Sequence, residues 1–291
     1  MRSYPAGYEL ITPRNLESAL FVLHEEPGQW TPIAGGTEIM VLFSAGKLAV
    51  RKLISVALPE LRDVVESSDF ISIGGGCSFT QIRRNTGIQK YFPMLAQCAS
   101  WTGGIANQNR ATIGGNLANA SPAADSPPAL LAYGAELELI SARGKRRIPY
   151  EQFHLGYKRI ALAQDELIGS IILSKHVRGS FRYACKVGTR NAQAISKLCL
   201  AATGGLRGDR VEDIRIGIGS VAPVPLRLLR TEKVLLEATL NDVTIAEARR
   251  TLLSEIEPID DIRSTASYRK LVAGNLLEEM LRSFAVSGAR G

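Results

Sequence analysis

The chain has 291 residues, of which 45% are hydrophobic and 22% charged, and its net charge is +7. This composition is typical of a folded, soluble protein, and the length suits two or three domains. No apolar run approaches the roughly 20 residues that a membrane span requires. The segment "MRSYPAGYEL" lacks the apolar stretch of an export signal, so we expect a cytoplasmic protein.

The first 55 residues alternate between helical and strand patterns. Apolar residues at helical spacing predict a helix over 12–25, with Thr12 as its N-cap and Pro13 in its first turn. Short apolar runs at 30–36 and 52–56 predict two strands. We therefore expect an N-terminal α/β subdomain over residues 1–55.

A second subdomain with a mixed sheet is expected over residues 56–175. Its predicted elements are a strand at 70–76 that ends in glycines, a helical turn at 80–85, helices at 90–103 and 124–135, a hairpin around 143 and a strand at 166–173. Residues 176–291 follow a third pattern. Three neighbouring antiparallel strands are predicted at 181–188, 194–206 and 214–222, followed by helices at 228–238, 243–256 and 266–285.

The side chains that usually carry catalysis or bind metals are scattered. Four cysteines at 77, 98, 185 and 199 fit no iron–sulfur or zinc spacing, and the three histidines form no paired metal-binding pattern. We therefore name no catalytic residue and no metal ligand. The densest basic run, "ARGKRR" at 142–147, reads as a solvated hairpin tip. With 6% aromatic residues, the chain lacks the interleaved aromatic and basic residues of a nucleic-acid site.

Two Gly-Gly pairs stand out, in "AGGTEI" at 34–39 and "ATIGGN" at 111–116. Each follows an apolar run that reads as a strand ending in a turn. One such pair is commonly an ordinary turn, but glycine turns also gather backbone N–H groups into nests that bind anions. Two nests can clamp a diphosphate, with neutral donors from Thr37, Thr112 and Asn116. Asp125 is then a candidate acceptor for a ribose or adenine group.

Other nucleotide-binding loops do not fit these segments. "GGGCSF" at 74–79 and "AGGTEI" lack the G-x-G-x-x-G spacing of a Rossmann loop, and no Walker loop with its Gly-Lys-Ser/Thr ending is present. Spacing alone leaves the ligand of the two Gly-Gly segments open.

Five segments give the chain a resemblance to the FAD-binding medium subunit of molybdenum hydroxylases, the family of bacterial xanthine dehydrogenases, carbon monoxide dehydrogenase and related aldehyde- or nicotinate-type enzymes. They are "AGGTEIM" at 34–40, "NRATIGGNLANASPAAD" at 109–125, "PPALLAYGAELEL" at 127–139, "GSVAPVPLR" at 219–227 and "DIRSTASYR" at 261–269. The resemblance covers nearly the whole chain. It implies an α+β chain with a vanillyl-alcohol-oxidase/PCMH-type FAD-binding fold, in which the first two subdomains clamp FAD.

The resemblance also implies which residues bind FAD. Both Gly-Gly segments would bind its pyrophosphate, Asp125 would lie on the nucleotide side, Thr102 and Gly103 would approach the flavin, Ile168 would make a backbone contact, and Lys186 would be a basic contact. The remaining implied residues are Ile33, Ala34, Gly35, Gly36, Thr37, Glu38, Ile39, Thr112, Ile113, Gly114, Gly115 and Asn116. For Ile168 and Lys186 the alternative is an ordinary strand residue and a surface charge.

One departure from the family pattern lies just before the second Gly-Gly segment. The family usually has Gln-Ile-Arg where this chain has Ala106, Asn107 and Gln108. This difference affects the expected loop shape near the flavin ring rather than the pyrophosphate site. No insertion carries cysteines for a further iron–sulfur cluster.

The function implied by the resemblance is electron transfer within a xanthine dehydrogenase-like oxidoreductase. A large subunit would hold the molybdenum cofactor, a small subunit would hold two [2Fe–2S] clusters, and this chain would pass their electrons through FAD to NAD⁺, a quinone or oxygen. The complex is expected to be a dimer of heterotrimers. Two alternatives stay open: a self-sufficient flavin oxidase of the same superfamily, and a scaffold subunit that has lost FAD.

Overall fold

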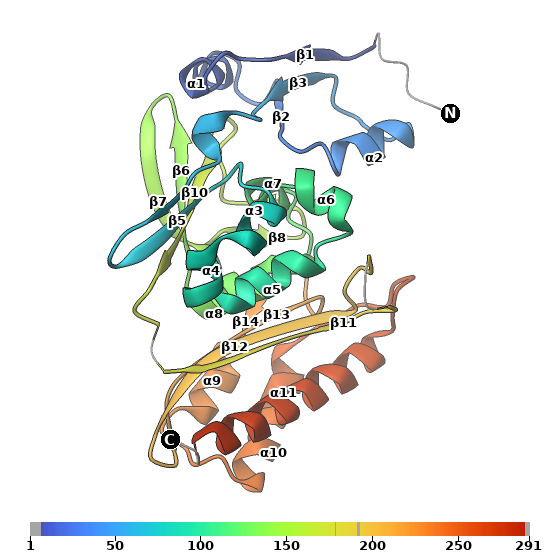
Figure 1. The fold of residues 1–291 in the computed structure, drawn as a ribbon. Helices are drawn as coiled ribbons and strands as arrows, with labels where there is room; N and C mark the ends of the chain where they lie inside the picture. Colours follow the sequence, from blue (N-terminus) through green and yellow to red (C-terminus); the bar gives the residue numbers. More distant parts are fainter. Residues whose placement is uncertain (1–6, 178, 191–192, 289–291) are drawn as a thin grey trace.

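The computed structural model describes residues 7–177, 179–190 and 193–288 and arranges them as three main sheets along the chain (Figure 1). The N-terminal sheet is parallel and has the order β1-β3-β2. Its strands are Glu9–Ile11 (β1), Thr31–Ile33 (β2) and Lys52–Ser55 (β3), with helices Leu16–Glu25 (α1) and Ile39–Ser44 (α2) between them.

The first helix starts later than its sequence pattern indicated. The predicted N-cap was Thr12, but α1 begins at Leu16 and its N-cap is Asn15. The Asn15 side-chain oxygen accepts from the backbone N–H of Ser18 at 2.9 Å. Asparagine caps at least as well as threonine, so the cap nearer to the apolar stripe prevails.

The middle sheet has five strands in the order β4-β5-β10-β6-β7, all paired antiparallel. Its strands are Val64–Glu66 (β4), Phe70–Gly74 (β5), Glu136–Ser141 (β6), Gly144–Pro149 (β7) and Leu167–Ser174 (β10), and His154–Gly156 (β8) pairs separately with Arg159–Ile160 (β9). The helices of this part are Phe79–Arg84 (α3), Thr86–Tyr91 (α4), Pro93–Trp101 (α5), Ile105–Arg110 (α6), Ile113–Ala118 (α7) and Ser126–Tyr133 (α8), with 3-10 turns at Pro59–Leu61 and Tyr150–Gln152.

The C-terminal sheet lies between two helical layers (Figure 1). The three predicted strands are Phe181–Val187 (β11), Leu198–Arg207 (β12) and Arg210–Gly219 (β13), and a two-residue strand, Leu226–Arg227 (β14), extends them to four. Helices α5 and α8 contact one face, and α11 (Ala266–Gly288) contacts β12 from the other. The other two predicted C-terminal helices are Leu229–Leu235 (α9) and Asp242–Glu255 (α10).

Each sheet contributes to a hydrophobic core, and the cores extend across the sheet boundaries. The N-terminal core includes Ile140 and Leu167 from the middle sheet, and the middle core includes Ala201 from β12. The third core lies between the C-terminal sheet and its helices. The chain therefore passes from one sheet to the next near residues 55 and 175. The three-domain division at these residues stays an interpretation of the sequence.

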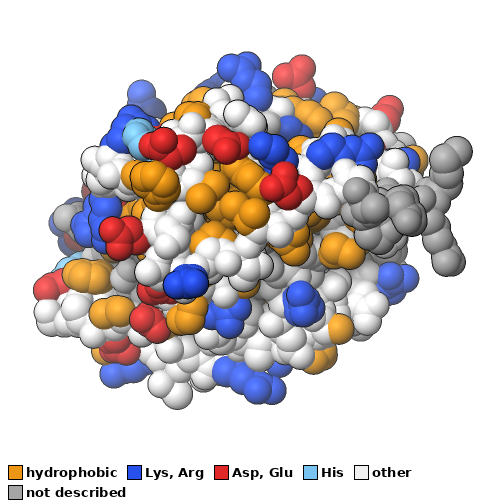
Figure 2. Space-filling model, turned by 90° about the horizontal axis from the view of Figure 1, so that it is seen from above, with side chains coloured by type: hydrophobic (Ala, Val, Ile, Leu, Met, Phe, Trp, Pro, Cys, Tyr) orange, Lys and Arg blue, Asp and Glu red, His pale blue; other side chains and the backbone are white. Residues whose placement is uncertain are grey.

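The face that carries the N-terminal elements is shown in Figure 2, which looks down on the top of Figure 1. Apolar side chains gather near its middle, with acidic and basic side chains around them. Exposed apolar residues of this part of the chain include Leu10 on β1 and Phe21 on α1. No helix in the described part of the chain is long and apolar enough to cross a membrane.

Candidate functional site

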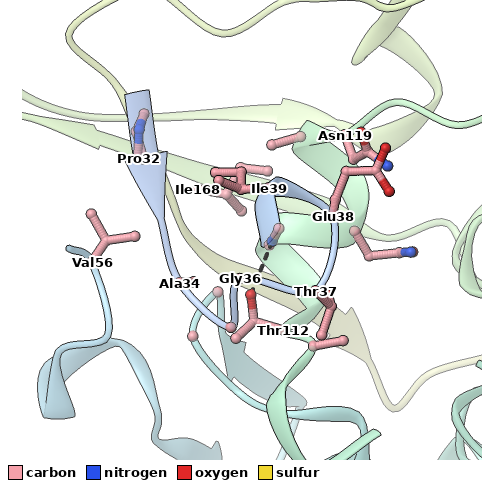
Figure 3. Close-up of a pocket in the computed structure, with 18 of the residues that line it drawn as sticks. Pro32, Ala34, Gly36, Thr37, Glu38, Ile39, Val56, Thr112, Asn119 and Ile168 are labelled. Atoms are coloured by element: carbon pink, nitrogen blue, oxygen red, sulfur yellow. Dashed lines mark hydrogen bonds between the residues drawn. The ribbon is translucent and has the colours of Figure 1, made fainter. Parts of the chain in front are cut away.

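A cavity of about 590 Å³ lies where the N-terminal and middle sheets meet. Glycines occur in four of the stretches that contribute lining residues: 34–39, 75–76, 102–103 and 111–119. Figure 3 shows the first loop passing next to Thr112, with Ile168 and Val56 on other walls. This volume is within the roughly 300–1,000 Å³ that small-molecule and cofactor sites occupy.

The first Gly-Gly pair forms the turn between β2 and α2. Gly36 has φ of +75°, a conformation in which a side chain is strained. Its carbonyl accepts from the N–H of Met40 at 2.9 Å, which closes the turn at the start of α2. In the described part of the chain, the backbone N–H groups of residues 36–39 find no protein acceptor, so they are available to a ligand.

The two predicted glycine segments pack directly against each other. A Cβ atom added to Gly35 would lie 1.8 Å from the carbonyl oxygen of Arg110, so only glycine fits there. The Arg110 side chain also donates from Nε to the Gly35 carbonyl at 3.1 Å. Residues 75 positions apart in the sequence are therefore fixed together at one wall of the cavity.

The second Gly-Gly pair differs from its prediction as a turn after a strand. It forms the first turn of helix α7, and the strand expected before it is replaced by α6 and the N-cap Thr112. The Thr112 hydroxyl accepts from the Gly115 N–H at 3.2 Å, and Gly114 donates to the Gly75 carbonyl at 2.8 Å. These N–H groups already have protein acceptors, so this segment is not a second open nest.

The two glycines of α7 have different surroundings. A Cβ on Gly114 would lie 2.6 Å from the Gly75 carbonyl oxygen, which is backbone and cannot move aside cheaply. A Cβ on Gly115 would meet only the Thr112 hydroxyl, at 2.9 Å. Gly115 is exposed and lines the cavity, whereas Gly114 is buried. Gly114 therefore allows close backbone packing, and Gly115, which has no side chain, leaves space for a ligand in the cavity.

One glycine segment of the site was not predicted. Gly75 and Gly76 follow β5 and line the cavity, because their backbones are fixed by bonds to Gly169 and Leu61 at 2.8 and 2.7 Å. Their spacing in the sequence indicated only that this segment is not a Rossmann loop. Three consecutive glycines at the end of an apolar strand were the signal that was available for them.

Asp125 and Lys186 form a buried ion pair beside the cavity. Lys186 Nζ lies 2.7 Å from Asp125 Oδ2 and donates to the Trp101 carbonyl at 2.9 Å. Burial raises the pKa of the Asp125 carboxyl above its ordinary value, while the Lys186 ammonium and the Ser196 hydroxyl act to lower it. Lys186 is thus no surface charge, although neither member of the pair is among the cavity-lining residues.

Most of the predicted site residues meet at the cavity. Those that line it are Ala34, Gly35, Gly36, Thr37, Glu38, Ile39, Thr102, Gly103, Thr112, Gly114, Gly115, Asn116 and Ile168. Four do not line it: Ile33, Ile113, Asp125 and Lys186. Ile113 is fully buried in the middle core, and Ile33 is the last residue of β2.

Thirteen further lining residues were not predicted, and most are small or apolar. They are Thr31, Pro32, Val56, Leu61, Gly75, Gly76, Asn107, Ala111, Ala118, Asn119, Ile160, Leu162 and Leu167. Such residues carry no chemical signal in a sequence. Asn107 belongs to the segment where the chain departs from the family pattern.

The chemistry of the lining fits a dinucleotide better than a charged small substrate. Of the described lining residues only Glu38 is charged, and Figure 3 shows its side chain directed toward Asn119. A phosphate here would be stabilised by backbone N–H groups and hydroxyls rather than by cations. Within the described residues no cluster of three or more His, Cys, Asp or Glu side chains is gathered to hold a metal ion.

Comparisons with known proteins agree with this geometry. Residues 6–175 match the FAD binding domain in molybdopterin dehydrogenase, and residues 183–284 match the CO dehydrogenase flavoprotein C-terminal domain. The chain is 30% identical over 283 residues to a xanthine dehydrogenase FAD-binding subunit of Escherichia coli O157:H7, with 95% of each chain covered. It is 25% identical to the carbon monoxide dehydrogenase medium chain of Hydrogenophaga pseudoflava, covering 96% of this chain and 97% of that one.

Solved structures show the same fold. One is carbon monoxide dehydrogenase from Hydrogenophaga pseudoflava, with a TM-score of 0.91, 25% identity and coverage of 97% of this chain and 98% of that one. Another is quinoline 2-oxidoreductase from Pseudomonas putida 86, with a TM-score of 0.89, 21% identity and 99% of each chain covered. The chain belongs to the family of FAD-binding subunits of molybdopterin-dependent dehydrogenases.

Proposed function

We propose that this chain holds FAD in the described cavity and passes electrons from [2Fe–2S] clusters of a small partner subunit to NAD⁺, a quinone or oxygen. The observation that carries the proposal is the convergence of the two Gly-Gly segments on one cavity, where the N–H groups of residues 36–39 have no protein acceptor. The FAD supplies the redox chemistry. The chain itself binds, orients and shields it.

Each wall has its own part in holding the cofactor. The 36–39 turn offers N–H groups to the pyrophosphate, and the hydroxyls of Thr37 and Thr112 add neutral donors. Apolar residues such as Ile168 exclude water. Thr102 and Gly103 form the wall next to the Asp125–Lys186 pair, and we assign this wall to the flavin-facing side of the site. This places Asp125 on the flavin side, in place of the nucleotide side that the resemblance implied.

The proposal requires partners. The carbon monoxide dehydrogenase relative is named a medium chain, which implies companions of other sizes. We propose a small [2Fe–2S] subunit and a large molybdenum-cofactor subunit, arranged as a dimer of heterotrimers in the cytoplasm.

The basic hairpin between β6 and β7 is a weak candidate for docking these partners. Arg143 pairs with Asp165 and Arg146 with Glu166, while Lys145 and Arg147 lie near Glu138. Its positive charge is therefore largely balanced within the chain.

The test is a titration of FAD into the flavin-free chain, followed by flavin fluorescence, for wild type, Gly115→Val and Gly156→Val. A Cβ at Gly156 meets only the flexible Arg159 side chain at 3.9 Å, and Gly156 does not line the cavity, so this variant is the matched control. Wild type and Gly156→Val should bind FAD, and Gly115→Val should not. Equal binding by all three would refute the assignment of the cavity.

Two other outcomes would favour the alternatives. Reduction of the bound flavin by an organic substrate, with no partner present, would indicate a self-sufficient oxidase. A wild-type chain that binds no FAD either alone or with its co-expressed partner subunits, yet assembles with them, would indicate a scaffold.

A further inference from the structure

A chain of buried hydrogen bonds runs from the C-terminal helix to the wall of the cavity. At its centre Ser196, which is 1% exposed, donates its hydroxyl hydrogen to Asp125 Oδ1 at 2.5 Å. The other oxygen of this carboxylate accepts from Lys186 at 2.7 Å. Ser196 belongs to neither Gly-Gly segment and lies at no cavity wall, so no motif draws attention to it.

The ion pair is linked to cavity-lining residues in two segments of the chain. Lys186 donates to the carbonyl of Trp101, whose neighbours Thr102 and Gly103 line the cavity. Asp125 precedes Ser126, whose hydroxyl lies 2.8 Å from the side-chain oxygen of Asn116, another lining residue. A change in the geometry of the pair would therefore be transmitted to lining residues of two segments, 102–103 and Asn116.

The other end of the network explains two sequence motifs that the cavity does not use. The Ser220 hydroxyl in "GSVAPVPLR" donates to the Ser196 carbonyl at 3.2 Å. Arg269, from "DIRSTASYR", donates to the Ser220 carbonyl at 2.7 Å and to Asp261 at 2.8 Å. Both motifs thus support Ser196 from the C-terminal domain.

We propose that Ser196 is a positioning residue for the bound flavin, because it holds Asp125 and Lys186 in one geometry behind the cavity wall. The inference rests on the proposed function, since it assumes FAD in the cavity. Ser196 itself does not contact the cofactor. It acts through the ion pair, keeping the Asp125 carboxylate ionised and its charge balanced by Lys186.

The groups facing Asp125 define what removal of the hydroxyl would do. They are the Lys186 ammonium from β11, the Ser196 hydroxyl, and the Cys199 thiol from β12, whose Sγ lies 3.7 Å from the Asp125 carbonyl and which also contacts Cys98 of α5. Without the Ser196 hydroxyl, only Lys186 lowers the pKa of the Asp125 carboxyl against the effect of burial, so this pKa rises further. Protonation of Asp125 then leaves the Lys186 charge unbalanced beside the flavin, which favours the electron-rich, reduced cofactor.

The experiment measures the reduction potential of bound FAD against pH for the complete chain, in wild type, Ser196→Ala and Thr203→Val. Thr203→Val is the matched control, because it removes another buried hydroxyl that takes no part in the ion pair. The Thr203 hydroxyl donates to the Ala132 carbonyl, with 3.2 Å between the two oxygens. Reduction of the flavin itself takes up protons, so the potential of every variant rises as pH falls, and the protonation of Asp125 should add a further rise to this slope. In Ser196→Ala the further rise should begin about one pH unit higher, the size expected for one lost hydrogen bond to a charged group. Thr203→Val should follow wild type.

Asp125→Asn completes the set, because an amide cannot titrate, so its profile should keep the slope of the flavin itself and lose the further rise. If Ser196→Ala and Thr203→Val give the same profile as wild type, Ser196 has no positioning role, while FAD binding by all of them keeps the proposed function intact. If wild type binds no FAD either alone or with its co-expressed partner subunits, the proposed function is wrong and this inference fails with it.

Discussion

The neighbouring glycines Gly114 and Gly115 provide a sharp test of how the site is built, because the same substitution should affect stability at one position and FAD binding at the other. Both lie in the first turn of α7. We predict that Gly114→Ala destabilises the apo chain, and that Gly115→Ala leaves its stability nearly unchanged but weakens FAD binding.

The magnitudes follow from the contacts. Alanine in place of glycine gains about 1 kcal/mol of helix propensity at either position. At Gly114 the new Cβ would lie 2.6 Å from a backbone oxygen, and overpacking of this kind costs about 1–3 kcal/mol. Loss of the Gly114 N–H bond to Gly75 adds about 1 kcal/mol. The net destabilisation is therefore about 1–3 kcal/mol.

At Gly115 the gain in helix propensity is offset by the capping bond. The Thr112 hydroxyl, 2.9 Å from the added Cβ, must turn away, and losing an N-cap bond costs about 1 kcal/mol. The two terms cancel to within a few tenths of a kcal/mol. The added methyl group instead projects from an exposed position that lines the cavity.

Two measurements separate the effects. Denaturant unfolding of the apo chain gives the stability, and titration with FAD, followed by flavin fluorescence, gives the affinity. The reasoning is refuted if Gly114→Ala unfolds at the wild-type denaturant concentration. It is equally refuted if Gly115→Ala loses as much stability as Gly114→Ala.

Three further predictions concern other parts of the chain. Gly35→Ala should lose FAD binding together with stability, because its Cβ would collide with the Arg110 carbonyl, and a variant that unfolds normally in denaturant would contradict this. Arg146→Met should lower the stability near neutral pH but not in acid. The Arg146 guanidinium lowers the pKa of Glu166, so this contribution is present above the ordinary glutamate pKa and is lost as pH falls through the lowered one; an equal loss at both pH values would argue against it. Phe284→Ala should destabilise the C-terminal domain by about 3–5 kcal/mol, measurable by thermal unfolding, because the ring is 1% exposed and stacks at 4.4 Å on Phe181.

Much of the fold was predictable because its elements have strong local patterns. Alternating and apolar runs identified the strands β10 to β13, and helical spacing identified α9, α10 and α11. The short elements were harder to predict. Helix α7 has six residues, of which two are glycines, so propensity argued against a helix, and packing of Gly114 against Gly75 decided in its favour.

The candidate site was predictable where it depends on glycine. Gly35 and Gly36 stand out because the sequence repeats the Gly-Gly pair at Gly114 and Gly115, and the close contact of Gly35 with Arg110 and the φ of +75° at Gly36 give the physical reason for the first pair. Residues such as Val56 and Leu167 line the same cavity without any signal, since apolar residues are common throughout a core.

The scarcity of charged side chains in the cavity explains why the site depends on the geometry of its glycine segments. A site that bound a diphosphate through lysine and arginine would keep much of its affinity after a change in backbone geometry, because long side chains adapt. Here the available donors are backbone N–H groups of residues 36–39, whose directions are set by Gly36 and by the contact between Gly35 and Arg110. Salt should therefore affect FAD affinity only weakly, whereas any substitution that shifts this turn should affect it strongly. Comparing FAD affinity at low and high salt for wild type and Arg110→Leu checks this reasoning. A steep salt dependence in wild type would show that cations rather than backbone geometry hold the pyrophosphate. An Arg110→Leu affinity equal to that of wild type would show that the contact between Gly35 and Arg110 does not set the geometry of this turn.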